Sequence, residues 1–290
     1  LLEALEEGSQ VPVQTGEGGS GGGNITVAAP ISWNGTGTLV LQAHGDIHIN
    51  EAITAQTGGL TVSPGGTATA TAAIDVGRFT LTSGTWHQVG SDVPAFTARD
   101  FRIGDGATFV RAKGGNGEEG SPYEIFDVYG LQGMGSAGML RNHYVLVDDI
   151  DASITRGWHD GAGFVPIGTD ASMFRGIFDG DGHVIHGLFM DRGNQDLVGL
   201  FGDINVDARV ANVGLEGVQI TGRRYVGGLA GRSSGGQVTR SYVTGQVNGD
   251  TFVGGLIGSN HGSVSQSYSA AQVNGRSEVG GLVGRHANYG

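Results

Sequence analysis

The segment Phe178–His183 is the closest match in this sequence to a metal-binding loop. It reads Phe-Asp-Gly-Asp-Gly-His, and closely spaced carboxylates are oxygen ligands of the kind that Ca²⁺ prefers. An EF-hand loop that begins at Asp179 would need an oxygen ligand at position 5, glycine at position 6 and glutamate at position 12. These positions hold His183, Val184 and Met190. Because the pattern fails, we expect a tight Asp-Gly turn between two strands and no bound metal.

Acidic residues near position 150 are of the type that catalyses the hydrolysis of glycosidic bonds. The group consists of Asp148, Asp149, Asp151 and Asp160. Glycoside hydrolysis needs two carboxylates held at a set distance. Asp148 and Asp149 are adjacent, so a strand would direct them to opposite faces. We expect these residues to end a strand and to accept hydrogen bonds from backbone N–H groups of the turn. The sequence predicts no catalytic residue and no enzyme.

The histidines do not form a recognisable site either. His183 and His186 lie three residues apart, which does not suit one face of a strand. His44 and His48 lie at a predicted coil edge with no acidic residue in register. The sequence contains no HExxH zinc signature, and no Gly-x-Ser-x-Gly motif lies in the strand-to-helix context that a nucleophile elbow needs. We expect polar surface histidines, and no cofactor is predicted.

Threonine and alanine alternate over Thr67–Thr71, a pattern that can form a flat threonine face on a solenoid, as in ice-binding proteins. Such a face needs threonine again on the neighbouring coils. At 21-residue steps, the equivalent positions are Asp46, His48 and Asn50 upstream and Gln88, Gly90 and Asp92 downstream. We therefore expect an ordinary exposed strand or loop.

Five aromatic residues are candidates for sugar-stacking platforms, namely Trp33, Trp86, Trp158, Tyr242 and Tyr268. The two tyrosines lie one repeat apart, and a ring stacked on its counterpart contributes about 0.5–1.5 kcal/mol. For the tyrosines we favour such a ladder over a sugar platform.

Composition excludes several classes of protein. The 290 residues include 57 glycines and no cysteine, without a collagen-like G-X-Y period. Only 16 Lys and Arg oppose 28 Asp and Glu, and no basic run is present, so the electrostatic pattern of nucleic-acid binding is missing. No stretch approaches the ~20 apolar residues of a membrane span. Abundant glycine suits tight corners, because glycine adopts positive φ angles without steric strain.

Regularly spaced apolar residues predict short strands from Asn24 onward. Leu39, Leu60 and Leu81 follow one another at a 21-residue interval, and Ile103 extends the series at a 22-residue interval. The 22-residue interval also relates Ile25–Val27 to Ile47–Ile49 and Ile31 to Ile53. Each lies in a short alternating apolar/polar run, which is typical of strands. Before them, residues 1–7 predict a short helix or a turn.

The middle of the chain is less regular. Glycine-rich residues 114–120 indicate a joint between regions. Residues 123–128 and 143–147 predict strands. Val128, Leu131 and Met134 are spaced for one side of a short helix, although glycines between them weaken it.

A repeated phrase dominates the last third of the chain. Val226–Leu229 recurs as Val253–Leu256 after a 27-residue step and as Val279–Leu282 after a further 26-residue step, and a looser copy begins at Val198. A 26-residue step also relates Ser241–Tyr242 to Ser267–Tyr268, Val238 to Val264 and Val247–Gly249 to Val273–Gly275. Periods of this length indicate a stacked structural unit. We expect valine on valine, tyrosine on tyrosine and an asparagine ladder.

These periods predict an all-β parallel β-helix, or β-solenoid, with about 21–28 residues per coil. Successive coils would lie ~4.8 Å apart, and each backbone group inside the stack would pair with the next coil. Parallel pairing needs a long crossover, which one circuit of a solenoid supplies. An antiparallel sandwich is the competing fold.

Three parts of the sequence resemble known families. The phrase Val-Gly-Gly-Leu followed by Ser-Tyr and Val-Asn-Gly resembles the GLUG repeat of large bacterial surface proteins. The lead-in that often precedes this repeat is similar to Pro122–Tyr123, His143–Leu146, Asp149–Asp151, Pro166–Gly168 and Phe178–His183. The first third is similar to filamentous-haemagglutinin-like exoproteins of two-partner secretion systems, through Leu5, Val13–Thr15, Asn24–Val27, Pro30–Trp33, Thr38–Ala43 and Gly45–Asn50.

The resemblance implies a right-handed β-helical adhesin, secreted through an outer-membrane partner. We divide the chain into haemagglutinin-like coils (1–117), a lead-in region with a short helix (118–197) and GLUG-repeat coils (198–290), and expect it to be an excerpt of a longer protein. The predicted function is a structural segment of a secreted or cell-surface adhesin that binds glycans or proteins of hosts, neighbouring cells or matrix. A polysaccharide-binding or polysaccharide-active β-helix and a self-assembling extracellular filament are the alternatives.

Overall fold

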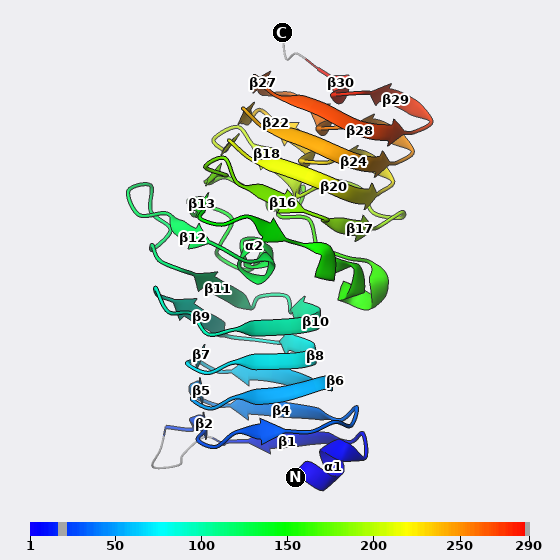
Figure 1. Cartoon of the computed structure of the whole chain (residues 1–290). Coiled ribbons are helices and arrows are strands. Elements are labelled where there is room, and N and C mark those ends of the chain that lie inside the picture. The colour runs from blue at the N-terminus through cyan, green and yellow to red at the C-terminus, as the bar shows by residue number, and fades with distance from the viewer. Residues whose placement is uncertain (17–21, 288–290) are drawn as a thin grey trace. The chain divides into compact units, whose positions relative to one another are not determined.

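The computed structural model describes residues 1–16 and 22–287. The chain divides into two compact units, residues 1–113 and 114–290. In both units, the named strands pair only in parallel, each with a strand from the next circuit of the chain. Figure 1 shows these strands stacked one above the next within each unit. The all-β prediction and the parallel pairing are confirmed, and the antiparallel sandwich is wrong.

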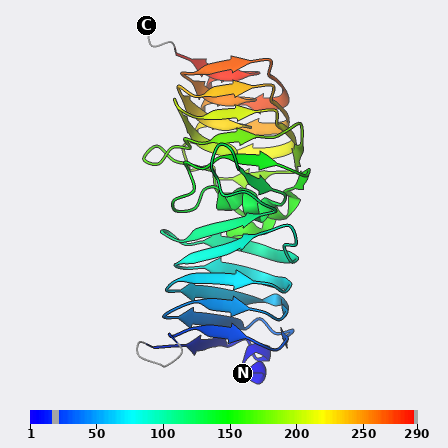
Figure 2. The ribbon, with the colours of Figure 1, turned by 90° about the vertical axis from the view of Figure 1, so that its left-hand side faces the viewer.

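Unit 1 contains two parallel sheets. Sheet 1 is formed by β1 (Gln10–Gln14), β4 (Thr38–Ala43), β6 (Ile53–Pro64), β8 (Ile74–Leu81) and β10 (Phe96–Ile103), in that order, with β3 (Ile31–Ser32) also pairing with β6. Sheet 2 is formed by β2 (Ile25–Val27), β5 (Ile47–Ile49), β7 (Thr67–Ala70), β9 (Thr85–Val89) and β11 (Thr108–Ala112). Figure 2 shows their strands as successive layers. The helix predicted at the start is α1 (Leu2–Glu6), which buries Leu5.

Alternating burial explains why these short segments form strands. β2 and β5 each bury their first and last residues, and Ile25 lies opposite Ile47. Because alternate side chains of a strand point to opposite faces, each isoleucine packs inward on the isoleucine of the next coil. The predicted 22-residue register is confirmed here.

One predicted column of unit 1 is wrong. Leu39 lies opposite Leu60 as expected, but Leu60 lies opposite Phe79, whereas Leu81 lies opposite Val62. The register between β6 and β8 shifts at a bulge between Ala55 and Gly59, which shortens the step along the column by two residues. An extra residue on one strand of a pair locally breaks the ladder in this way.

The threonine run was also aligned incorrectly downstream. Thr67 lies opposite Thr85, and Thr85 lies opposite Thr108, because the step from β7 to β9 is shorter than the 21-residue interval. Upstream, His48 lies opposite Thr69 as predicted, and its Nδ1 lies 3.2 Å from the Thr69 hydroxyl. The strand is only half-exposed, because Ala68 and Ala70 are buried.

Strand β1 was missed by the sequence analysis, which placed the first strand after Asn24. Its outward residues include Pro12, which lies opposite Val40 in β4. Proline lacks a backbone N–H and is tolerated on edge strands, where β1 lies in sheet 1.

Aromatic side chains fill the end of unit 1. Phe79, Trp86, Phe96, Phe101 and Phe109 pack together, with the Trp86 and Phe109 rings stacked at 5.9 Å. The residue opposite Trp86 on the preceding coil is the small Ala68. A large side chain against a small one keeps the core filled without strain.

Unit 2 contains four parallel sheets. Sheet 3 is formed by β12 (Tyr123–Ile125), β13 (Tyr144–Leu146), β15 (Ile177–Asp179), β19 (Arg209–Ala211), β23 (Gln237–Thr239) and β27 (Ser263–Ser265). Sheet 4 is formed by β14 (Ile150–Asp151), β16 (Val184–His186), β20 (Gly214–Thr221), β24 (Tyr242–Asn248) and β28 (Tyr268–Asn274), with β17 (Phe189–Asp191) pairing with β20. Sheet 5 is formed by β18 (Phe201–Asn205), β22 (Ala230–Ser234), β26 (Ile257–Asn260) and β30 (Val283–His286), and sheet 6 by β21 (Arg224–Gly227), β25 (Thr251–Gly254) and β29 (Ser277–Gly280).

The less regular part of unit 2 contains the predicted helix. It is α2 (Val128–Gly133), capped by the Asp127 carboxylate, which accepts a hydrogen bond from the Gly130 N–H at 2.8 Å. All six helical residues are buried rather than only one side. A 3₁₀ segment, η1 (Ser153–Gly161), is interrupted by non-helical residues at Trp158, His159 and Asp160.

The repeated phrase forms the predicted columns. Val198, Val226, Val253 and Val279 lie opposite one another on successive coils. Tyr242 likewise lies opposite Tyr268, and Val238 opposite Val264, while the Asn274 amide donates to the Asn248 side-chain oxygen at 2.8 Å. The inward assignment of Leu256 is confirmed, because its side chain is fully buried.

Glycine has two roles in these coils: Gly217, Gly235 and Gly245 adopt positive φ as expected, whereas the glycines of the repeated phrase do not. Neither glycine of the repeated phrase adopts a positive φ angle. Instead, a Cβ on Gly227 would lie 2.8 Å from the Gly258 backbone nitrogen, and one on Gly255 would lie 2.3 Å from the Gly281 carbonyl oxygen, both on the next coil. At these two positions the phrase requires glycine because neighbouring coils approach too closely for any side chain.

Positive φ angles in these coils belong to Gly217, Gly235 and Gly245 and also to several non-glycine residues. Leu197, Tyr225, Phe252 and Glu278 precede the four stacked valines and have φ between 51° and 61°. A second column with positive φ consists of Asn212, Arg240 and Gln266. Non-glycine residues rarely adopt this conformation, so its return at the same place in each coil shows that the stack imposes it.

Candidate functional site

The predicted Asp-Gly turn is confirmed. It joins β15 to β16, and the Asp179 carboxylate accepts hydrogen bonds from the Asp181 backbone N–H at 2.9 Å and from the Asn212 amide at 2.8 Å. The first interaction closes the turn itself, and the second binds the turn to the next coil. Within residues 1–16 and 22–287, no three His, Asp or Glu side chains converge to hold a metal ion.

An acid–histidine row crosses the outer face of sheet 4. His183 Nδ1 lies 3.1 Å from an Asp149 carboxylate oxygen, and His186 Nδ1 lies 3.5 Å from a Glu216 oxygen. The Tyr242 hydroxyl donates to Glu216 at 2.7 Å. Each contact joins neighbouring strands, so the row links four coils. Sequence spacing alone had indicated unconnected surface histidines, because each acidic partner lies a whole coil away along the chain.

The electrostatics of this row hold two of its carboxyl groups ionised. Hydrogen bonds from the Val184 N–H and from His183 lower the pKa of Asp149. Hydrogen bonds from Ser153 lower the pKa of Asp151, which lies opposite His186. The hydrogen bond to Glu216, together with burial, raises the pKa of Tyr242 to about 12. As predicted, Asp149 accepts a backbone hydrogen bond, although its donor lies on the next coil.

The tryptophans are not sugar platforms. Trp33, Trp86 and Trp158 are all at most 2% exposed, and the Trp33 indole donates to the Gly37 carbonyl at 3.0 Å. Tyr242 and Tyr268 form the predicted ladder, with ring centroids 5.1 Å apart and planes within 3°. In this arrangement, the facing sides of the two rings cover each other.

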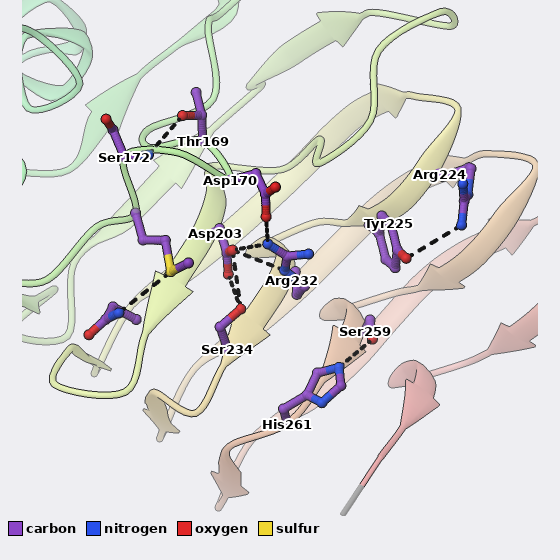
Figure 3. Close-up of polar contacts among 12 residues, drawn as sticks. Thr169, Asp170, Ser172, Asp203, Arg224, Tyr225, Arg232, Ser234, Ser259 and His261 are labelled. Atoms are coloured by element: carbon purple, nitrogen blue, oxygen red, sulfur yellow. Dashed lines mark hydrogen bonds and ion pairs between the residues drawn. The ribbon is translucent and has the colours of Figure 1, made fainter. Parts of the chain in front are cut away.

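The most strongly built polar cluster lies on sheet 5 and was not predicted. We call it the Arg232 cluster; it comprises Asp170, Asp203, Arg232 and Ser234 (Figure 3). Asp203 on β18 lies opposite Arg232 on β22, and the Arg232 Nε donates to the Asp203 carboxylate at 2.9 Å. The Ser234 hydroxyl donates to the same carboxylate at 2.9 Å. Asp170, from the loop before β15, also pairs with Arg232.

Burial makes this cluster energetically important. The Asp203 side chain is fully buried, and burial raises its pKa although Arg232 and Ser234 donate to it. Burial alone would lower the pKa of Arg232, but its hydrogen bonds to Asp203 and Asp170 outweigh this effect and raise it. Removing one partner of a buried ion pair costs about 3–5 kcal/mol, because the other charge is left uncompensated.

Aromatic and cationic groups surround the cluster. The Tyr225 and Phe252 rings stack at 4.8 Å. Arg232 and Arg224, which Figure 3 draws together with Tyr225, lie over the Tyr225 ring at 5.8 and 5.3 Å. The Ser259 hydroxyl lies 3.4 Å from His261 Nε2. All of these contacts are within the protein, and the cluster holds neighbouring coils together.

A second charged column lies at the start of the coils. It consists of Asp196, Arg223, Asp250 and Arg276, at steps of 27, 27 and 26 residues, close to the steps of 28, 27 and 26 residues between the stacked valines. Arg223 donates to both Asp196 carboxylate oxygens, at 2.7 and 2.9 Å, and the Arg276 Nε lies 3.2 Å from Asp250. A signal for this column was therefore present in the sequence, because its charges share the period of the repeat.

The comparisons with known proteins agree with the repeat. Residues 222–248, which include β21–β24, match the GLUG motif family. The chain is 40% identical over 201 residues to halomucin of Haloquadratum walsbyi, covering 64% of this chain. It is 38% identical over 182 residues to a putative Gly-rich membrane protein of Evansella cellulosilytica, covering 51% of this chain.

This chain spans only a small part of those relatives, 2% of halomucin and 21% of the Gly-rich protein. No solved structure gave a significant match. The resemblance of the first third to filamentous haemagglutinins is not tested by these matches and stays a prediction. Among the described residues, no helix has the length and apolar character required to cross a membrane.

Proposed function

We propose that this chain is a structural segment of a large secreted or surface-anchored bacterial adhesin. Its coils would hold binding regions away from the cell, and it would have no catalytic activity of its own. The observation that carries the proposal is the set of columns on successive coils, in which valine, tyrosine and asparagine each contact their own kind. Such contacts serve cohesion along the stack.

The names and lengths of the relatives support the location. One relative is named halomucin and the other a putative Gly-rich membrane protein, and both are far longer than this chain. We propose that the protein is secreted or displayed at the cell surface, where its partners are glycans or proteins of hosts, neighbouring cells or matrix. The proposal includes an outer-membrane secretion partner and self-association of the chain. It does not include binding of nucleic acid.

We infer that the coils wind in a right-handed sense, with about 21–28 residues per circuit in most places. Connections between parallel strands of one sheet are right-handed in about 98% of known cases. Where bulges and short turns occur, as between β7 and β9, the step is shorter.

The acid–histidine row favours polysaccharide binding as the second candidate. It places carboxylates, imidazoles and a tyrosine hydroxyl on one exposed sheet face. Catalysis is less well supported, because glycoside hydrolysis needs a carboxylic acid that stays protonated, whereas the pKa values of Asp149 and Asp151 are lowered.

Attachment of the producing cells tests the proposal. Leu256→Asp in the parent protein should disrupt the coils and reduce attachment to a surface, while the amount of protein exported is measured separately. The matched control is Val206→Asp, because Val206 is also a large apolar residue of unit 2 but is 61% exposed. Normal attachment by cells whose exported Leu256→Asp protein is shown to have unfolded coils contradicts a structural role.

The purified chain separates the alternatives. Incubation with a panel of polysaccharides should release no new reducing ends or unsaturated products. Product formation that is lost in Asp149→Asn or Glu216→Gln would favour the polysaccharide-active alternative. An apparent molecular mass from light scattering that grows with protein concentration would favour the self-assembling filament.

A further inference from the structure

The repeated valines create an ambiguity that contacts between valines alone cannot resolve. We number the coils of unit 2 by residues: coil 1 is 196–221, coil 2 is 223–248, coil 3 is 250–274 and coil 4 is 276–286. If coil 3 stacked directly on coil 1, Val253 would meet Val198, and Val264 would meet Val210. Both are valine-on-valine contacts like the native ones. Repetitive strands whose register is weakly specified are prone to slippage and to exchange between chains.

The charged residues do distinguish the coils. Along sheet 5, Asp203, Arg232, Ser259 and Arg285 lie opposite one another on coils 1 to 4. The buried Asp203 carboxylate is paired by Arg232 of coil 2. With coil 3 in that place, Asp203 would face the hydroxyl of Ser259 and lose its cation.

The charged column at the start of the coils gives the same discrimination. Natively, Arg223 of coil 2 lies between Asp196 of coil 1 and Asp250 of coil 3, and Asp196 holds it through two hydrogen bonds. A one-coil slip would place Asp250 next to Asp196, and like charges at this separation repel. A two-coil slip would place Arg276 on Asp196 and Arg285 on Asp203, so it would restore both attractions.

We propose that the Arg232 cluster and the Asp196–Arg223–Asp250–Arg276 column together form a register key, which prevents near-identical coils from stacking one coil out of place. The key acts both within one chain and between two copies of the chain. It disfavours a slip by an odd number of coils, such as one, but not a slip by two coils. This role is independent of what the protein binds, so it can hold or fail separately from the adhesin proposal.

Engineered disulfides can report the register, because the chain contains no cysteine. Thr239 lies opposite Ser265, with their hydroxyl oxygens 3.3 Å apart, so Thr239→Cys/Ser265→Cys reports native stacking. Ala211 lies opposite Thr239 on its other side. Ala211→Cys/Ser265→Cys therefore spans two strand spacings, ~9.6 Å, too far for a native disulfide. A one-coil slip would bring this second pair together.

Both reporters are placed in three backgrounds and refolded from denaturant under mild oxidation. The first background has the natural key. The second removes it without changing net charge, through Asp203→Ser, Arg232→Ser, Arg223→Ser and Asp250→Ser. The third is a matched control that removes four exposed charges outside both columns, through Asp207→Ser, Arg209→Ser, Glu119→Ser and Arg141→Ser. Non-reducing electrophoresis and peptide mapping quantify each disulfide within and between chains.

We expect a several-fold rise in the Ala211→Cys/Ser265→Cys disulfide when the key is removed, and no rise in the control. Equal slip disulfide in all three backgrounds, with native disulfide formed normally, would overturn the register key. If removal of all four charges prevents folding, as shown by loss of the native disulfide, the milder Asp203→Asn/Arg232→Gln background decides by the same comparison. That variant keeps polar, hydrogen-bonding side chains at both positions while removing the two charges.

Discussion

Unit 1 and the GLUG coils of unit 2 make parallel stacks by two different routes. In the GLUG coils, like residues lie on like at a nearly constant step, as in the column of Val226, Val253 and Val279. In unit 1, like pairs such as Ile25 and Ile47 occur beside columns of unlike residues, in which Leu60 lies opposite Phe79, and Ala68 lies opposite Trp86. The glycines of the GLUG coils allow close approach, whereas aromatic rings fill the core of unit 1.

The difference teaches that a stack constrains total volume more tightly than it constrains residue identity. Core packing tolerates substitution when volume and pattern are kept. Unit 1 meets this condition by compensation between neighbouring coils, and the GLUG coils meet it by repetition. Repetition makes the register visible in the sequence, but it also creates the ambiguity that the register key would resolve.

The largest effect is expected from a charge inside a repeated column. Leu256→Asp removes a fully buried leucine and leaves a carboxylate without a cation. Loss of the leucine costs about 2–5 kcal/mol and an uncompensated buried charge about 3–5 kcal/mol, so cooperative unfolding of unit 2 should be lost. Denaturant unfolding followed by circular dichroism measures it. Leu282→Asp, in the last coil, should be much milder, and equal damage by both variants would contradict the column.

The next largest effect should appear in the compensated core of unit 1. Trp86→Ala leaves a cavity between Ala68 and Phe109 and should destabilise by about 3–5 kcal/mol. His87→Ala changes the adjacent outward residue and should have little effect. Thermal unfolding of both variants tests the prediction. If Trp86→Ala lowers the stability of unit 1 no more than His87→Ala does, the packed aromatic rings do not stabilise this stack.

A smaller effect should separate two glycines of the same phrase. A Cβ on Gly255 would lie 2.3 Å from the Gly281 carbonyl oxygen, whereas a Cβ on Gly281 would meet nothing within 4 Å. Gly255→Ala should therefore destabilise unit 2 by about 1–3 kcal/mol through overpacking. Gly281→Ala should be neutral or stabilising by up to about 1 kcal/mol. Melting temperatures of the pair measure the contrast, and equal values would mean that close approach does not explain the phrase.

The smallest effect concerns pH. The pKa values of Asp149, Asp151 and Asp196 are lowered on folding, so the folded state binds fewer protons. Their stabilisation is present above the unfolded pKa, about 3.9, and is lost as pH falls through the folded pKa. Asp203, whose pKa is raised, opposes this trend, because acidification favours its protonated folded form.

Melting temperatures from pH 7 to pH 3 should therefore fall less steeply in Asp149→Asn than in the unchanged protein. The amide oxygen of the substituted side chain can still accept the backbone hydrogen bond from Val184, so stability near neutral pH should be largely kept. Asp207→Asn, at an exposed aspartate, is the control. Identical pH profiles for the unchanged protein and Asp149→Asn would exclude this carboxyl group as a cause of acid sensitivity.

Sequence reasoning predicted the columns in which one residue type repeats. It failed where a large side chain on one coil packs against a small one on the next. The columns of Val226 and Tyr242 were predictable because a single period relates all their members. The bulge between Ala55 and Gly59 was not, because nothing local distinguishes an inserted residue from a change in coil length. Among the polar residues, the Asp-Gly turn was predicted from local chemistry, whereas the contact of His183 with Asp149 depends on how two coils align.

The amino-acid sequence alone determined the strand periodicity, the GLUG register and the alternation of charge that accompanies it, because all three are written at a fixed spacing. The tertiary structure decided which glycines are required by close approach, which corner residues take positive φ, and that Asp203 is a buried carboxylate. Those properties depend on the distance between neighbouring coils. The amino-acid sequence of one coil does not determine that distance.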